Sequence, residues 1–387
     1  MKIGIVGYGK MGCEIFHGLF DKNDFMPWVT VVCIEDTEIH TVKIQKELDK
    51  ALRRKKITED VYNEKCRKFA FVNSLSELSG CDIVIECITE DLEEKRKVFK
   101  ELSEIVSEQC IFASNTSSLL LEKIFEDVPN PERCIGMHFF YPVKLSGFVE
   151  INKLSVTHDK TVNAVRDISS QIGKNTVIFE NDYHMYMNQF ISLAVSQGIY
   201  STEKAGIKVR DSMEILSEIF TMHGLFGMID SIGLELLRRS SGNFQLERIQ
   251  PVVKYGDSWM EKCVCDGCPG VPGTFLSYME NKQSAESGNI DAEELKCTVI
   301  SVLLNEIVHM ASEVTDPDIV SEAVADAVGI EGKWSDYYKA YGYERISNVL
   351  EILRNDTGWE LYTPADRSLY DKYLDKESIP VMNKYEV

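Results

Sequence analysis

Residues 2–12 read KIGIVGYGKMG, and the order of residue types in this stretch predicts the fold of the N-terminal part of the chain. An apolar, β-branched run comes first, three glycines follow at Gly7, Gly9 and Gly12, and apolar residues then recur at helical spacing. In a strand–turn–helix unit of this kind, the first glycine permits a tight turn and the second lets a diphosphate approach the backbone. The third lets the helix pack closely on the strand. The stretch therefore predicts the start of a nucleotide-binding α/β domain.

A carboxylate is expected at the end of the second strand of such a domain, where it accepts hydrogen bonds from a ribose. The apolar run VVCIED, residues 31–36, places Glu35 at that point. A carboxylate there also repels a 2′-phosphate, so Glu35 favours NAD over NADP. The alternative is a glycine turn that binds no ligand. The residues expected to contact the cofactor in this part of the chain are Gly7, Gly9, Met11, Gly12 and Glu35.

Strand and helix patterns alternate along the chain as far as about residue 180. FAFVNS, CDIVIECI and CIFASN are typical of short strands, whereas EEKRKVFKELSEIV carries its apolar residues at helical spacing. Such alternation is typical of a parallel sheet that is covered by helices on both faces. We therefore predict a Rossmann-like α/β domain, residues 1–180, that binds NAD.

Beyond residue 180 the strand patterns fade, and the sequence predicts an all-α C-terminal region. Two short similarities suggest an internal repeat there. EILSE (214–218) resembles DIVSE (318–322), and SIGLELL (231–237) resembles AYGYERI (340–346). We expect two tandem, related helical domains, residues 181–280 and 281–387.

The composition of the 387 residues restricts the partners of the protein. A formal net charge of −20 disfavours nucleic acid and anionic membrane surfaces. The basic stretch KALRRKK, residues 50–56, is interpreted as a solvated helix end in preference to a phosphate site. No signal-peptide pattern and no apolar run long enough to span a bilayer is present, so the cytoplasm is the expected compartment. The 11 cysteines are expected to be free thiols, and no metal site is predicted.

Several further stretches resemble the L-3-hydroxyacyl-CoA dehydrogenase family. They are DIVIECITEDLEEKRKVF, IFASNTSSL, RCIGMHFFYPV, GFVEI and NQF, which follow the glycine motif in order. The resemblance implies an NAD-dependent oxidoreductase of fatty acid metabolism that interconverts 3-hydroxyacyl and 3-oxoacyl thioesters, with coenzyme A as the expected carrier. The last third looks like the duplicated C-terminal domain of the larger family members. That duplication implies a monomer with an internal pseudo-dimer, or a weak homodimer.

The active-site residues that the resemblance implies are Ser117, His138, Glu150 and Asn188. His138 would be the general base, because histidine titrates near neutral pH. Glu150 would hold the other ring nitrogen, and Ser117 would donate a hydrogen bond to the substrate oxygen. Asn188 would position the substrate or Ser117 from the helical region, so the site is expected in an interdomain cleft. The structural alternatives are a core histidine, a surface carboxylate and two helix caps.

Two further residues, Glu90 and Lys95, resemble family residues near the nicotinamide end of the cofactor; the alternative is a solvated helix start. Tyr141 stands where the family usually has asparagine, and we expect it to control access of the substrate to the site. This departure leaves two alternatives open. In the first alternative, the substrate is a hydroxy acid that is free or bound to a carrier protein. In the second, the chain is a catalytically weak NAD-binding protein.

Overall fold

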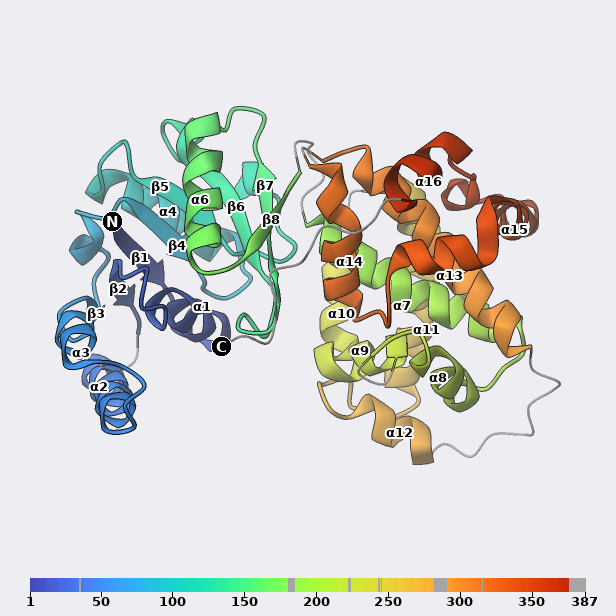
Figure 1. The fold of residues 1–387 in the computed structure, drawn as a ribbon, viewed down its shortest axis with the longest axis horizontal. Helices are drawn as coiled ribbons and strands as arrows, with labels where there is room; N and C mark the ends of the chain where they lie inside the picture. Colours follow the sequence, from blue (N-terminus) through green and yellow to red (C-terminus); the bar gives the residue numbers. More distant parts are fainter. Residues whose placement is uncertain are drawn as a thin grey trace. The chain divides into compact units, whose positions relative to one another are not determined.

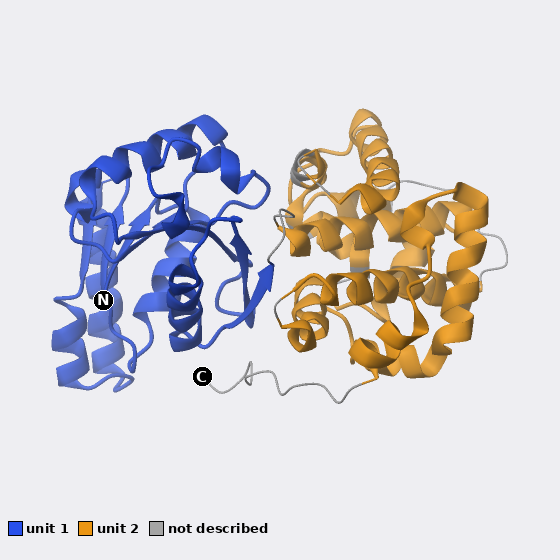
Figure 2. Cartoon of the chain, turned by 90° about the horizontal axis from the view of Figure 1, so that it is seen from above, with its two compact units in different colours: residues 1–184, 382–387 blue, residues 185–381 orange. Residues whose placement is uncertain are grey.

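The computed structural model of the chain describes residues 1–34, 36–179, 185–221, 224–242, 244, 246–281, 291–314 and 316–375. The chain divides into two compact units, which Figure 2 colours separately: unit 1 is Met1–His184, and unit 2 is Met185–Val381. Each unit is described by itself below.

Unit 1 is built on an eight-stranded sheet of order β3-β2-β1-β4-β5-β6-β7-β8 (Figure 1). The first six strands are parallel, β7 runs antiparallel to β6, and β8 is parallel to β7. The chain reverses its strand order between β1 and β4, and a crevice at such a point is where open α/β sheets bind ligands. The strands are β1 Lys2–Val6, β2 Trp28–Val32, β3 Phe69–Val72, β4 Ile83–Glu86, β5 Ile111–Ser114, β6 Cys134–Phe139, β7 Phe148–Lys153 and β8 Asn175–Phe179.

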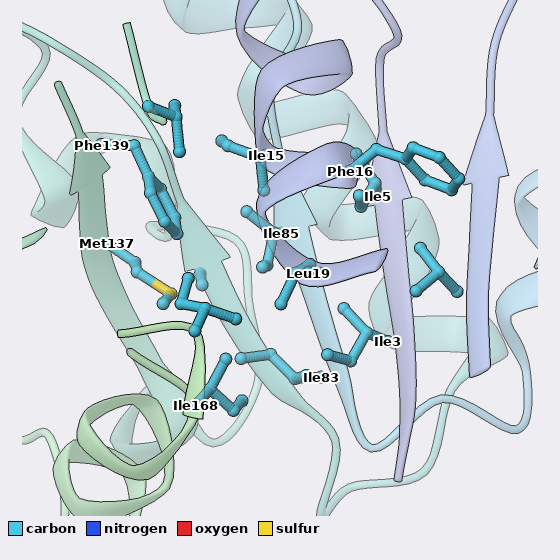
Figure 3. Close-up of a cluster of buried hydrophobic side chains, with 14 of the residues drawn as sticks. Ile3, Ile5, Ile15, Phe16, Leu19, Ile83, Ile85, Met137, Phe139 and Ile168 are labelled. Carbon is cyan, nitrogen blue, oxygen red and sulfur yellow. The ribbon is translucent and has the colours of Figure 1, made fainter. Parts of the chain in front are cut away.

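Helices cover both faces of this sheet, as predicted. Their bounds are α1 Lys10–Phe20, α2 Thr37–Arg53, α3 Glu59–Lys65, α4 Leu92–Ile105, α5 Leu121–Ile124 and α6 Asp159–Gln171, with 3₁₀ turns η1 Leu75–Leu78 and η2 Pro131–Arg133. On one face, Ile15 and Leu19 of α1 belong to a core with strand residues such as Ile5, as Figure 3 shows. On the other, Phe99 of α4 packs with Val84. Alternate strand residues therefore supply the two cores.

The described part of unit 2 is helical apart from one isolated bridge, between Phe220 and Ile330. The prediction of a Rossmann-like domain followed by an all-α region is therefore confirmed. None of its described helices is long and apolar enough to cross a membrane. The helices are α7 Tyr186–Lys204, α8 Val209–Ser217, α9 Gly224–Ile232, α10 Leu234–Ser241, α11 Gln250–Cys265, α12 Phe275–Asn281, α13 Ala292–Ala311, α14 Val320–Val328, α15 Trp334–Thr357 and α16 Arg367–Leu374, with 3₁₀ turns η3 Glu247–Ile249, η4 Pro317–Ile319 and η5 Glu360–Tyr362.

The two segments proposed as tandem helical domains pack together within unit 2. The SIGLELL and AYGYERI stretches each contain a glycine with positive φ that interrupts helical backbone. Gly233 separates α9 from α10 at φ +93°, and Gly342 kinks α15 at φ +72°. EILSE and DIVSE do not correspond in this way, because the first ends α8 and the second begins α14. A domain boundary near residue 280 stays a prediction.

Buried polar contacts join the two halves of unit 2. Arg248 binds the carboxylate of Glu306 on α13 through two nitrogens, with Nε–Oε2 at 2.9 Å and Nη2–Oε1 at 2.7 Å. Tyr362, from the second half, donates its hydroxyl hydrogen to the amide oxygen of Gln197 on α7 at 2.9 Å. Glu306 is only 1% exposed, so its charge depends on Arg248 for compensation.

Candidate active site

The three glycines of the turn after β1 are there for different structural reasons. Gly7 has φ +99°, and a Cβ there would lie 2.6 Å from the carbonyl oxygen of Cys87. A Cβ on Gly12 would lie 2.1 Å from the Gly7 carbonyl oxygen, so the helix could not sit this close to the turn. At Gly9, by contrast, a Cβ would meet no atom of the described residues within 4 Å. Gly7 and Gly12 are therefore required by the fold, whereas Gly9 leaves open space above the backbone.

The N-terminus of α1 fits the diphosphate of NAD. Gly9 is the N-cap residue, and because it has no side chain it provides no hydrogen-bond acceptor for the N–H groups of the first turn. The turn contains no acidic residue and begins with Lys10. Backbone N–H groups at such a helix end bind anions, and the helix dipole adds to their attraction. The half-buried side chain of Met11 packs against the core, and its contact with a cofactor stays a prediction. Glu35 lies outside the described residues.

His138 and Glu150 face each other across two antiparallel strands. They are directly paired in the register of β6 and β7, and the side chains of paired residues lie on the same face of a sheet. His138 Nδ1 lies 3.3 Å from Glu150 Oε2, and the two residues are 5% and 0% exposed. A buried carboxylate beside Nδ1 favours the tautomer in which Nδ1 carries the proton. Nε2 is then left as the hydrogen-bond acceptor.

Ser117 meets the other nitrogen of this imidazole. It follows β5, and its Oγ lies 3.4 Å from His138 Nε2. The loop that carries Ser117 is also tied to the histidine strand, because Asn115 Oδ1 accepts a 2.8 Å hydrogen bond from the backbone N–H of Phe139. The structure therefore brings Ser117, His138 and Glu150 into one line at the carboxyl ends of β5 and β6.

The remaining predicted residues are placed as follows. Asn188 is half-buried in the first turn of α7, in unit 2, so its part in the site stays a prediction. Glu90 accepts hydrogen bonds from the Ser117 loop, including one of 2.7 Å from the Ser117 N–H. Lys95 is 1% exposed and contacts Glu90 and Glu86. Glu86 was not predicted as a site residue, although its position at the end of an apolar strand, shortly before the helix of Lys95, was a usable signal.

Tyr141 is 54% exposed, just beyond the end of β6. Lys10 Nζ lies 3.6 Å from the centroid of its ring, which is a cation–π contact. The tyrosine ring thus contacts the first residue of α1, which follows Gly9. This contact links the loop after His138 to the N-terminus of α1.

Comparison with known proteins places these features in a family. The NAD-binding domain of 3-hydroxyacyl-CoA dehydrogenase matches residues 2–183. The mitochondrial hydroxyacyl-coenzyme A dehydrogenase of Homo sapiens is 31% identical over 245 residues, which cover 60% of this chain and 76% of the human protein. The chain belongs to the 3-hydroxyacyl-CoA dehydrogenase family. As a member, it is an NAD-dependent oxidoreductase.

Two further relatives show how far the similarity of sequence and of fold extends along the chain. The 3-hydroxybutyryl-CoA dehydrogenase of Bradyrhizobium diazoefficiens is 28% identical over 236 residues, or 60% of this chain and 80% of that protein. The crystal structure of the 3-hydroxybutyryl-CoA dehydrogenase of Escherichia coli superposes with a TM-score of 0.75 and covers 97% of this chain and 98% of that one. The two sequences are only 17% identical, so this comparison shows a shared fold and nothing more.

Proposed function

We propose that this family member interconverts 3-hydroxyacyl and 3-oxoacyl thioesters, with coenzyme A as carrier and His138 as the general base and acid. The observation that carries the proposal is the position of His138 between Ser117 Oγ and the Glu150 carboxylate, at 3.4 and 3.3 Å. A buried histidine with one nitrogen held by a carboxylate and the other beside a hydroxyl is arranged for proton transfer.

Each residue then has a defined task. Oxidation of a secondary alcohol removes a proton from oxygen and a hydride from carbon, and NAD supplies the hydride acceptor when bound. His138 Nε2 takes the proton, and in the reverse reduction it returns that proton to the oxygen. Glu150 holds the Nδ1–H and stabilises the imidazolium that forms. Ser117 donates a hydrogen bond to the substrate oxygen, where negative charge develops.

Asn188 and Tyr141 complete the proposal as substrate-facing residues. Asn188 would hold the acyl group from the start of α7. Tyr141 would border the entrance for the acyl substrate. Because its ring contacts Lys10, a ligand that binds at the N-terminus of α1 would change the position of Tyr141. Tyr141→Ala should change the KM for the acyl substrate more than kcat, whereas Tyr141→Phe keeps the ring and should stay within about twofold of the wild type.

The test is NADH oxidation in the presence of acetoacetyl-CoA. We expect turnover in the wild type and a fall of kcat by about 10²-fold or more in His138→Gln, because a general base typically contributes 10²–10⁴-fold. His158→Gln is the matched control, since His158 is an exposed residue of the same unit. Tight NADH binding without turnover of any 3-oxo substrate would refute the proposal. Turnover of free acetoacetate at the same kcat/KM would refute the thioester as the preferred substrate.

A further inference from the structure

One carboxylate oxygen of Glu90 accepts several hydrogen bonds from the loop that carries Ser117. Glu90 Oε1 accepts hydrogen bonds from Thr116 Oγ1 at 2.6 Å and from the Ser117 N–H at 2.7 Å. It also accepts from the N–H and the hydroxyl of Ser118, at 2.9 and 3.1 Å. These four donors come from three consecutive residues. The position of the loop therefore depends on where the Glu90 carboxylate is held.

The other oxygen of Glu90 is held by a buried lysine. Lys95 Nζ lies 3.3 Å from Glu90 Oε2 and 2.5 Å from Glu86 Oε1. Glu86 is the last residue of β4, is 0% exposed, and also accepts a 2.6 Å hydrogen bond from Ser114 Oγ at the end of β5. A continuous chain of polar contacts thus runs from the ends of β4 and β5, through Lys95, to the loop of Ser117.

Lys95 and Glu90 stabilise each other's charged forms, whereas burial raises the pKa of Glu86 in spite of its contact with Lys95. Burial alone would lower the pKa of Lys95, but the carboxylates of Glu86 and Glu90 outweigh burial and raise it. Burial acts to raise the pKa of Glu90, yet the lysine and the loop donors lower it overall. Lys95 therefore stays cationic and Glu90 stays anionic across the neutral pH range, so the loop contacts remain charge-assisted and strong.

We propose that Glu86, Lys95 and Glu90 are positioning residues that set the reaction rate by holding Ser117 against His138. The inference rests on the proposed function of Ser117. Lys95 takes part by holding both glutamates, because its side chain is 1% exposed and contacts their two carboxylates. The rate is sensitive to this geometry, because a misplacement of about 1 Å can cost on the order of 10²-fold.

A double-mutant cycle between Glu90 and Ser117 tests the proposal. We expect Glu90→Ala and Ser117→Ala each to lower kcat at least tenfold, and the double variant to be no slower than Ser117→Ala. Glu90→Gln keeps an oxygen for the loop donors and should recover most of the rate. Glu94→Ala, which removes an exposed carboxylate from the first turn of α4, just after Glu90, is the matched control and should match the wild type. Additive losses in the double variant would overturn the proposal.

Cofactor affinity separates positioning from direct binding. The Kd for NADH should stay within about twofold in Glu90→Ala, and a rise in Kd as large as the fall in kcat would overturn the inference. Lys95→Met alone leaves the Glu86 charge buried and unpaired, so the double variant Glu86→Gln, Lys95→Met is used to preserve folding. It should show the same loss of kcat with unchanged Kd; wild-type kcat in this double variant would also overturn the proposal.

A spectroscopic measurement distinguishes failure of this inference from failure of the proposed function. The ¹⁵N chemical shifts of the His138 ring report its contact with Ser117 without any turnover. They should move in Glu90→Ala and in Ser117→Ala, and stay unchanged in Glu94→Ala. If Ser117→Ala keeps full activity, the proposed role of Ser117 fails, while the shifts still decide whether Glu90 positions the loop. Unchanged shifts in Glu90→Ala would overturn the positioning role.

Discussion

Adding one methyl group at Gly9 should separate cofactor binding from folding. A Cβ at this position would meet no described atom within 4 Å, and its backbone at φ −70° and ψ −164° is open to alanine. Alanine also restricts the unfolded chain slightly. Gly9→Ala should therefore change the free energy of unfolding by no more than about 0.5 kcal/mol. The methyl group would, however, fill the space through which a diphosphate approaches the turn.

The same change at Gly12 should act in the opposite way. Its Cβ would lie 2.1 Å from the Gly7 carbonyl oxygen, whereas carbon and oxygen normally approach to about 3.3 Å. α1 would have to move by roughly 1.2 Å, and overpacking of this kind typically costs about 1–3 kcal/mol. Gly12→Ala should thus lower the midpoint of thermal unfolding measurably, while Gly9→Ala should leave it near the wild-type value.

The assay combines thermal unfolding with a fluorescence titration of NADH. We expect Gly9→Ala to raise the Kd for NADH by at least tenfold, which corresponds to about 1.4 kcal/mol. Wild-type affinity in a folded Gly9→Ala variant would show that the diphosphate does not pass over Gly9, and the reasoning on the turn would be refuted. Gly12→Ala, compared at a temperature where it is folded, controls for indirect effects of strain.

Four further outcomes are expected. Glu150→Gln should lower kcat by about 10²-fold or more without changing the Kd for NADH, because it removes the carboxylate that holds the Nδ1–H of the imidazole. Burial acts to lower the pKa of His17, but hydrogen bonds to Asp21 and Cys13 raise it to about 10. Denaturant titrations should therefore find wild type more stable than Asp21→Asn by about 0.2–1 kcal/mol below pH 6.5, an advantage lost as the pH rises to about 10. Arg248→Met should destabilise unit 2 by about 3–5 kcal/mol in denaturant unfolding, and Glu306→Met added to it should restore most of the loss. Light scattering should give a monomer of 44.0 kDa or a weak dimer, and a tetramer would contradict the internal pseudo-dimer.

The nucleotide turn illustrates how far local sequence reaches. Gly7, Gly9 and Gly12 are close in the chain, and the contacts that require Gly7 and Gly12 lie within the turn itself and at Cys87, the residue after β4. Their spacing, together with the apolar run before them and the helical periodicity after them, predicted a strand, a tight turn and a close-packed helix. The alternation of strand and helix patterns likewise predicted the layered sheet, because each element must bury one face.

The arrangement of Ser117, His138 and Glu150 depends on contacts between strands that their spacing in the sequence does not predict. Ser117, His138 and Glu150 were identified by the resemblance of their motifs, but their distances follow from strand order and register. β5 must lie beside β6 for Ser117 to reach Nε2, and the pairing of β6 with β7 must place Glu150 opposite His138. A slip of one residue would turn Glu150 to the other face of the sheet.

The amino-acid sequence by itself determined the Rossmann-like fold, the glycine turn and the types of residue available for proton transfer, because these depend on local spacing. Only the tertiary structure decided what Glu90 and Lys95 contact. By resemblance they are expected near the nicotinamide end of the cofactor, with a solvated helix start as the alternative; in the fold, Lys95 is buried between two carboxylates. The physical reason is that Glu86 and the Ser117 loop reach this point from neighbouring strands. Burial and charge pairing arise only when those strands are assembled.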